Sequence, residues 1–182
     1  MNLIIFGPPG AGKGTQSKFI VKKFKMFQLS TGEFLRNEIA NNTTIGKKIS
    51  SIINSGSLVS DDIVSNLIEK VISNSKYHNN IIFDGYPRSL NQAKNLDNLL
   101  KKYNQKINLV LKLSVSLETI KRRILERRNL EKRADDNEEI AIKRYQTYEK
   151  STEPVIEYYK KLNLLKVING ERSIDQINKE IS

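Results

Sequence analysis

Short apolar runs alternate with longer helical patterns along this sequence. Five runs have the length and composition of buried strands: 3–6, 27–29, 81–83, 109–113 and 164–168. Between them, apolar residues recur every three or four positions, which predicts helices that bury one face, as at 19–24, 63–72 and 96–100. Strands that alternate with helices form parallel sheets covered by helices. The pattern predicts an α/β fold with a five-stranded parallel sheet wrapped by helices, and it places Phe24 in the core.

Two segments depart from this alternation. Residues 30–59 form a helical insertion between the second and third strands, and residues 128–137 are nearly all polar or charged without an apolar period. We expect the second segment to be a short, mobile lid over the surface. Residues 138–162 predict one long helix, which Pro154 should kink or interrupt. The chain then forms a single domain with its core at 1–29, 60–127 and 138–182.

Composition narrows the chemistry. The 182 residues suit one compact domain. The chain has no Cys and one His, which excludes disulfides and a zinc cluster. No apolar stretch approaches the roughly 18 residues of a membrane span, and the first strand is too short for a signal peptide, so we expect a soluble, cytoplasmic protein.

The chain is strongly basic, with 31 Lys and Arg against 20 Asp and Glu and a formal charge of +11. Such a balance suits an anionic partner: a nucleotide, a nucleic acid or a membrane surface. The excess Lys is scattered along helices, and no basic stripe interleaves with stacking aromatic residues. We therefore expect a nucleotide and neither a nucleic acid nor a membrane.

The strongest motif is the segment GPPGAGKGT at residues 7–15, which follows the first strand and opens the first helix. Glycines let backbone N–H groups turn onto phosphate oxygens, the helix N-terminus favours negative charge, and Lys13 can reach the phosphates. Gly14 stands where the usual pattern has Ser or Thr, and Thr15 follows it. The segment predicts a P-loop nucleoside triphosphate hydrolase-like fold.

This form of the loop resembles that of the adenylate kinase family. Further blocks resemble the family in the same order: LSTGEFLR at 29–36, GSLV at 56–59 with Asp61, FDGYPR at 83–88 with Gln92, and RADDN at 133–137. The resemblance covers essentially the whole chain. It implies reversible, Mg²⁺-dependent transfer of the terminal phosphoryl group of ATP to AMP, giving two ADP. The short lid without Cys resembles the members that lack a zinc site.

The resemblance implies an ATP site built on the phosphate loop and two later segments. Arg123 and Arg127 are four residues apart and share a helix face. Arg172 stands where family members often have Gly, so its contact with the adenine should come from the backbone. The implied ATP-binding residues are Gly10, Ala11, Gly12, Lys13, Gly14, Thr15, Arg123, Arg127 and Arg172.

The resemblance also implies an AMP site. The Gln92 amide can complement the N6/N7 edge of adenine. Related uridylate and cytidylate kinases typically have Asn at the position of Gln92 and Ala at that of Thr31, so both residues here favour adenine, and a UMP/CMP kinase is the alternative. The implied AMP-binding residues are Thr31, Arg36, Ser57, Leu58, Val59, Gly85, Tyr86, Pro87, Arg88, Gln92, Arg133 and Arg144.

Catalysis in such a site needs no general base, because the second pKa of a phosphomonoester is about 6. Positioning and electrostatic stabilisation fall to Lys13, Arg88, Arg123, Arg127, Arg133 and Arg144. Asp84, at the end of a strand, is expected to orient Mg²⁺ through water, while Asp135 and Asp136 anchor the lid arginines. We expect a monomer whose substrates are ATP, AMP and ADP.

Each of these residues also has a structural interpretation. Ser30 suits a helix cap, Arg36 and Gln92 could be exposed helical residues, and Arg88 could form a salt bridge. Two other classes of protein stay open on fold or charge alone. A P-loop GTPase lacks support because the chain has no Asn-Lys-x-Asp motif, and a nucleic-acid-dependent ATPase rests only on net charge.

Overall fold

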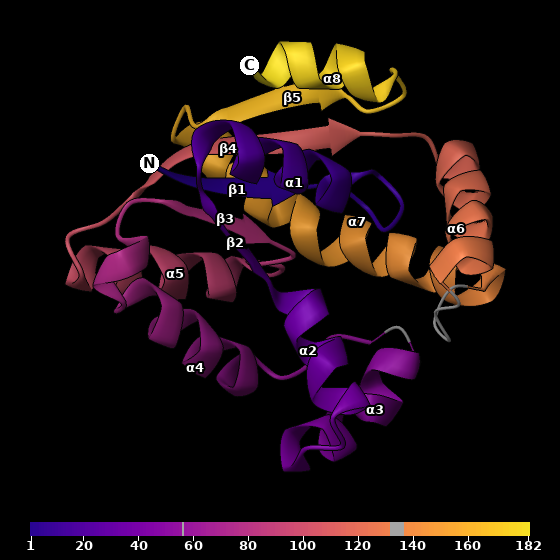
Figure 1. Ribbon diagram of the computed structural model, residues 1–182, viewed down its shortest axis with the longest axis horizontal. Helices are drawn as coiled ribbons and strands as arrows, with labels where there is room; N and C mark the ends of the chain where they lie inside the picture. The colour runs from indigo at the N-terminus through magenta and orange to yellow at the C-terminus, as the bar shows by residue number, and fades with distance from the viewer. Residues whose placement is uncertain (56, 132–136) are drawn as a thin grey trace.

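The computed structural model describes residues 1–55, 57–131 and 137–182. In these residues five parallel strands form one sheet in the order β2-β3-β1-β4-β5 (Figure 1). The strands are β1 (Asn2–Phe6), β2 (Phe27–Ser30), β3 (Ile81–Asp84), β4 (Ile107–Ser114) and β5 (Leu165–Asn169). The predicted sheet is confirmed, with each strand within two residues of its expected bounds.

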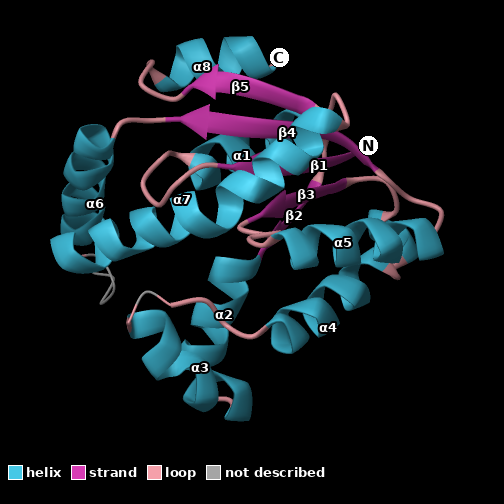
Figure 2. Ribbon diagram, turned by 180° about the vertical axis from the view of Figure 1, so that it is seen from behind, coloured by secondary structure: helices cyan, strands magenta, loops and turns pink. Residues whose placement is uncertain are grey.

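Helices cover both faces of this sheet (Figure 2). The described helices are α1 (Lys13–Phe24), α2 (Thr31–Ala40), α3 (Thr44–Asn54), α4 (Asp61–Ile72), the 3₁₀ turn η1 (Ser75–Tyr77), α5 (Leu90–Lys102), α6 (Leu117–Glu131), α7 (Glu138–Lys161) and α8 (Ile174–Ile181). Side chains alternate between the faces along each strand. Leu3 and Ile5 therefore pack toward α1 and α8, whereas Ile4 and Phe6 pack toward α4, α5 and α7. All five residues of β1 are buried, as expected for a central parallel strand.

The helices α2 and α3 extend away from the sheet (Figures 1 and 2). Ser30 caps α2, since its hydroxyl accepts a hydrogen bond from the Glu33 backbone N–H at 3.4 Å. Gly46 allows α3 to approach the end of α2, because a Cβ atom at this position would lie 2.0 Å from the Glu38 carbonyl oxygen. The insertion after the second strand is therefore helical, as predicted.

The predicted lid begins too early. Residues 128–131 belong to α6. Residues 132–136, which include the predicted Arg133, Asp135 and Asp136, lie outside the described residues. Leu, Arg and Glu favour helices even without an apolar stripe. The i,i+4 pair of Arg122 and Glu126, with 3.7 Å between the charged groups, adds support. Absence of an apolar period therefore did not mean absence of a helix.

Two smaller predictions about the helices also need correction. The long helix predicted over 138–162 is confirmed as α7 (Glu138–Lys161), and Pro154 does not interrupt it. The neighbouring Val155 and Ile156 are buried, so packing holds the helix through the proline. Phe24 was expected in the core but is 41% exposed at the end of α1, where the chain turns away through Lys25 with a left-handed φ of 54°.

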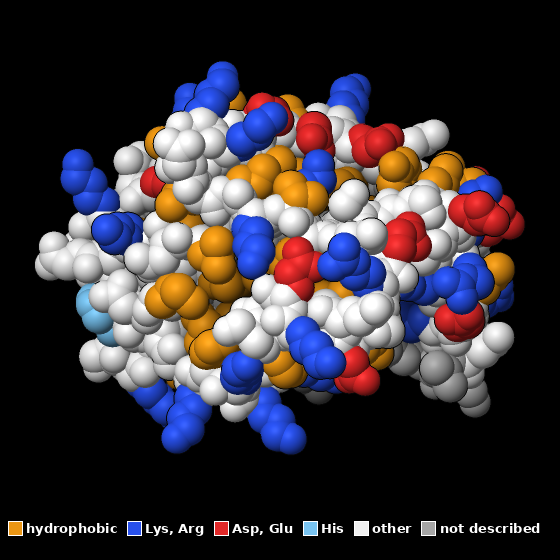
Figure 3. Space-filling view, turned by 90° about the horizontal axis from the view of Figure 1, so that it is seen from above, with side chains coloured by type: hydrophobic (Ala, Val, Ile, Leu, Met, Phe, Trp, Pro, Cys, Tyr) orange, Lys and Arg blue, Asp and Glu red, His pale blue; other side chains and the backbone are white. Residues whose placement is uncertain are grey.

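Lys and Arg side chains are spread among acidic and apolar ones on the face that Figure 3 shows. This distribution agrees with the scattered Lys of the sequence. Within the described residues, the helices are all too short or too polar to cross a membrane.

Candidate active site

A large cavity of about 1110 Å³ lies where the carboxyl ends of the strands meet the helices α1, α2, α6 and α7. It collects the predicted site residues that the structure describes. On the predicted ATP side these are Gly10, Ala11, Gly12, Lys13, Gly14, Thr15, Arg123, Arg127 and Arg172. On the predicted AMP side they are Thr31, Arg36, Ser57, Leu58, Val59, Gly85, Tyr86, Pro87, Arg88, Gln92 and Arg144. Arg133 lies outside the described residues.

The phosphate loop joins β1 to α1 at the floor of this cavity. Gly10 and Gly12 have φ angles of 82° and 94°, which residues with a side chain rarely adopt. Gly12 is the N-cap of α1 and offers no side-chain cap, so the N–H groups of the first helical turn are available to a ligand. The Lys13 ammonium group donates to the carbonyl oxygens of Gly7 at 2.7 Å and Pro8 at 3.1 Å.

Burial strongly affects Lys13. It lowers the pKa of the Lys13 ammonium group from its ordinary value to about 8. The nearby Asp84 carboxylate opposes this change, whereas the positive charges of Arg88, Arg127 and Arg144 reinforce it. An anionic ligand would relieve the repulsion among these cations.

Positive charge dominates the cavity. Among the described residues that line it, nine are Lys or Arg and three are Asp or Glu. The Arg88 guanidinium donates to the Gly85 carbonyl oxygen at 2.6 Å, and burial lowers the Arg88 pKa, with further lowering by Arg144 and Arg36. Arg144 in turn donates to the Ile53 carbonyl oxygen at 3.3 Å and so connects α7 with α3. The arrangement suits a ligand with several negative charges.

Gln92 is held by two partners beside this cationic cluster. Its side-chain Oε1 accepts a hydrogen bond from the Arg88 backbone N–H at 2.7 Å, and its Nε2 donates to Asp61 Oδ1 at 2.5 Å. Gln92 is 4% exposed. Nearby, the Thr31 hydroxyl donates to the Gly85 carbonyl oxygen at 3.0 Å. The alternative interpretation of Gln92 as an exposed helical residue is therefore wrong.

Asp84 is buried at the carboxyl end of β3, and its Oδ2 accepts a hydrogen bond from Gln28 Nε2 at 3.0 Å. Asp84 and Thr15, whose side chains carry oxygen atoms, both line the cavity. The described part of the chain contains no group of three or more His, Asp or Glu side chains that could hold a metal ion by themselves. This donor set fits Mg²⁺, a hard ion that proteins commonly hold by one or two carboxylates together with water and substrate phosphates.

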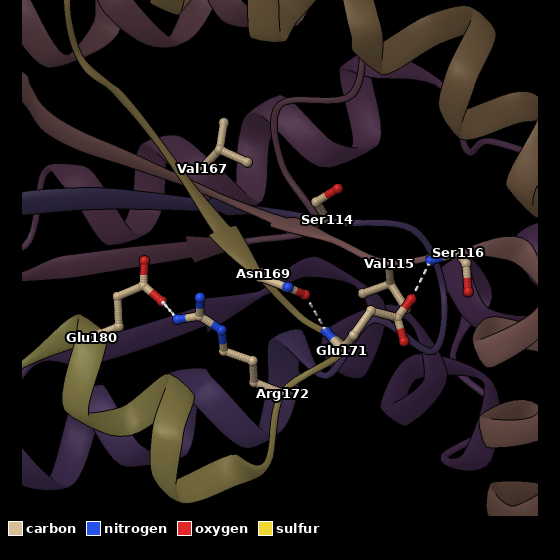
Figure 4. A pocket seen from close by; sticks show the side chains of 8 residues that line it. All are labelled: Ser114, Val115, Ser116, Val167, Asn169, Glu171, Arg172 and Glu180. Carbon is tan, nitrogen blue, oxygen red and sulfur yellow. Dashed lines mark hydrogen bonds and ion pairs between the residues drawn. The ribbon is translucent and has the colours of Figure 1, made fainter.

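Arg123 and Arg172 are arranged differently from the other predicted residues. Arg123 donates to the carbonyl oxygens of Gly170 at 2.9 Å and Ala11 at 3.5 Å, so it joins the phosphate loop to the segment after β5. The Arg172 side chain pairs with Glu180 at 3.1 Å beside a smaller cavity of about 490 Å³ (Figure 4).

Sequence reasoning missed part of the lining. The helix α7 contributes Thr147, Tyr148, Ser151 and Thr152 in addition to the predicted Arg144. These residues lie three, four, seven and eight positions after Arg144, so the helical period could have found them. Gln28 was also missed, and its polar amide in a short buried strand was the available signal.

A parallel sheet with a phosphate loop after β1 and a cationic cavity at its carboxyl edge defines a P-loop nucleotide-binding protein. The sequence model of the family described as "Adenylate kinase" matches residues 5–164. The chain therefore belongs to the adenylate kinase family, and it is an enzyme, an ATP:AMP phosphotransferase.

Individual relatives agree with this assignment. An adenylate kinase of Pelagibacter ubique is 44% identical, over 100% of this chain and 98% of the relative. Adenylate kinases of Azobacteroides pseudotrichonymphae and Prochlorococcus marinus are 43% and 42% identical, over 100% and 99% of this chain and 95% and 96% of the relatives. The predicted family and activity are confirmed.

Proposed function

We propose that this one cavity holds both nucleotides, with ATP on the phosphate loop and AMP between α2 and the segment 85–92. The observation that supports this most is the convergence of Lys13, Arg36, Arg88, Arg127 and Arg144 on one cavity next to the phosphate loop. Two phosphate groups brought together would repel each other, and these cations offset that repulsion.

At the ATP end, backbone N–H groups of residues 10–15 bind the phosphates, and Lys13 exchanges its carbonyl partners Gly7 and Pro8 for phosphate oxygens. Arg123 and Arg127 approach the same ligand from α6, with Arg133 as a further predicted contributor. The backbone near Arg172 contacts the adenine. Because Arg123 already connects the phosphate loop with Gly170, this side of the ATP site would be formed before ATP binds.

At the AMP end, Arg36, Arg88 and Arg144 bind the phosphate, and Gln92 binds the adenine. Thr31, the segment 57–59 and the segment 85–87 surround the nucleotide. Base recognition by Gln92 favours AMP over the alternative acceptors UMP and CMP. We also propose a division of the chain into core, insertion (30–59) and a short lid that follows α6.

Magnesium completes this proposal. Asp84 would hold Mg²⁺ through water, with the phosphates of ATP as the remaining ligands. The ion supplies neutralisation of the charge on the phosphate oxygens. The protein residues supply position: Lys13 holds the donor phosphates, and Arg88 lies between the donor and acceptor phosphates. The AMP phosphate needs no general base, since its second pKa of about 6 leaves it ionised near neutral pH.

The test is a product assay with Mg-ATP and AMP, UMP or CMP in separate reactions, with all nucleotides resolved by chromatography. We expect two ADP for each AMP consumed, little product from UMP or CMP, and no product after EDTA removes Mg²⁺. Product mainly from UMP or CMP would overturn the acceptor assignment. Loss of ATP without a phosphorylated acceptor would contradict phosphotransfer altogether.

We further propose a monomer that acts in the cytoplasm. The proposed site residues that the structure describes all line one cavity within a single chain, which supports a monomer. Light scattering of the purified protein, and fractionation of cells that express it, would test the two statements separately.

A further inference from the structure

The orientation of the Gln92 amide is fixed by hydrogen bonds to Asp61 and to the Arg88 backbone. Asp61 lies in the first turn of α4, and Gln92 lies in the first turn of α5, which packs beside α4 (Figure 1). Asp61 Oδ1 accepts from Gln92 Nε2 at 2.5 Å, and Asp61 Oδ2 accepts from Asn91 Nδ2 at 3.3 Å. The Arg88 backbone N–H donates to Gln92 Oε1 at 2.7 Å. Among the described residues, Asp61 is not part of the cavity lining.

These partners permit only one orientation of the amide. An ionised carboxylate can only accept hydrogen bonds, and a backbone N–H can only donate. Nε2 must therefore face Asp61, and Oε1 must face Arg88. Reversing the amide would place Oε1 against a carboxylate and two N–H donors against each other, which leaves buried polar groups unpaired.

The fixed amide still has binding capacity for a base. A primary amide has two N–H groups and two acceptor lone pairs, and each partner described above uses one of them. One N–H and one lone pair remain on a side chain that lines the cavity. They present a donor and an acceptor in fixed order, which complements the N6 amino group and the N7 acceptor of adenine. A 6-oxopurine would place its O6 acceptor against Gln92 Oε1.

We propose that Asp61 is a positioning residue that makes Gln92 select a 6-aminopurine over a 6-oxopurine in the acceptor nucleotide. The proposal rests on the role of Gln92 proposed above. Asp61 acts through Gln92 and does not touch the nucleotide. Asp61→Asn removes one of the two constraints with little change of shape, because an Asn amide can either accept from Nε2 or donate to Oε1. Only the Arg88 backbone N–H then favours the present orientation.

A matched control is available in the next residue. Asp62 lies in the same helical turn, and it is exposed. Asp62→Asn removes the same charge from the same helix N-terminus, so it reproduces the effect on the helix dipole without altering Gln92. Asp61→Ser, which keeps a small polar residue in the first turn, is a second variant in case Asp61→Asn does not fold.

The experiment measures kcat and KM for AMP and for inosine monophosphate at saturating Mg-ATP, together with the KM for ATP. Replacing a hydrogen bond to a charged group by a weaker one to a neutral amide predicts up to about a tenfold higher KM for AMP in Asp61→Asn. The ratio of kcat/KM for AMP to that for inosine monophosphate should fall about tenfold as well. Turnover at saturating AMP and the KM for ATP should stay within about twofold, because Asp61 is remote from the transferred group. Asp62→Asn should match the unaltered enzyme.

A double-mutant cycle separates positioning from a general structural role. If Asp61 acts through Gln92, Asp61→Asn should change nothing further in a Gln92→Ala background. Additive effects, equal losses with both nucleotides, or identical behaviour of Asp61→Asn and Asp62→Asn would each overturn the proposal. An unchanged KM for AMP in Gln92→Ala would refute the proposed role of Gln92 and this inference with it. A KM for AMP that is raised in Gln92→Ala but unchanged in Asp61→Asn would refute only the inference about Asp61.

Discussion

The two ends of the cavity recognise their ligands by different physical means. At the phosphate loop, the binding groups are backbone N–H groups and the half-buried charge of Lys13, which is repelled by Arg88, Arg127 and Arg144. At the other end, the neutral amide of Gln92 is fixed between Asp61 and the Arg88 backbone. Charge attracts any phosphate and so supplies affinity, whereas a fixed donor and acceptor distinguish one base from another. The difference predicts that substitutions at each end have different kinetic signatures.

The largest effect should come from Arg88→Ala. Arg88 is half-buried among the cationic groups and lies between the proposed donor and acceptor sites. Removing a preorganised donor that stabilises developing charge lowers turnover by about 10² or more. Steady-state turnover with Mg-ATP and AMP measures the effect, and Lys94→Ala, an exposed change on α5, is the control. Near-normal turnover of Arg88→Ala in a folded protein would remove Arg88 from the transition state.

A pH effect should follow from the burial of Lys13. Its pKa in the nucleotide-free enzyme is about 8, so above this pH the enzyme loses the ammonium charge and kcat/KM for ATP should fall about tenfold per pH unit. Turnover should hold to higher pH, because bound phosphates favour the charged form. Parallel profiles for kcat and kcat/KM would contradict this account.

The same shift has a consequence for stability, with the opposite sign. Above pH 8 the unfolded chain still binds the Lys13 proton while the folded chain has released it. The contribution of Lys13 to the free energy of unfolding should therefore increase from about pH 8 up to the unfolded pKa. Urea unfolding of the parent and Lys13→Met proteins at several pH values isolates this contribution.

The insertion should be sensitive to a single methyl group. Gly46→Ala places a Cβ atom against the Glu38 carbonyl oxygen, so α2 and α3 must separate. We expect a loss of about 1–3 kcal/mol in the free energy of unfolding. Urea unfolding measures this, with Ser51→Ala on an exposed position of α3 as the matched control. An equally stable Gly46→Ala protein would mean that the two helices are not in the close contact described.

The smallest effect is expected at Arg172. Its guanidinium pairs with Glu180 at an exposed position, where a salt bridge contributes about 0–1 kcal/mol. If the contact with ATP is made by the backbone, Arg172→Ala should change the KM for ATP by less than about twofold. A tenfold higher KM would assign the side chain a direct role.

The phosphate loop could be predicted from the sequence because its binding groups belong to nine consecutive residues that follow a strand. Its geometry depends on local glycine conformations, and those depend on residue type. The parallel sheet was likewise predictable, because each short apolar run precedes a helical pattern. Arg123 and Arg127 could be placed together by helical spacing alone.

Contacts between distant residues could not be predicted in the same way. Asp61 is 31 residues from Gln92, and Gln28 is 56 residues from Asp84. Both hydrogen bonds depend on the packing of α4 against α5 and of β2 against β3, which no local pattern specifies. The length of α6 was missed for another reason: its end relies on helix propensity rather than on an apolar stripe, and the charge pair of Arg122 with Glu126 lies before the missed residues.

The most direct test of the division between charge and orientation is an equilibrium titration of AMP and UMP into the parent protein, Arg36→Ala and Gln92→Ala. Arg36→Ala should weaken both nucleotides by the same factor, because Arg36 is assigned to the phosphate that they share. Gln92→Ala should weaken AMP and leave UMP nearly unchanged. Equal weakening of both nucleotides by Gln92→Ala, or a changed ratio of AMP to UMP affinity in Arg36→Ala, would contradict the account.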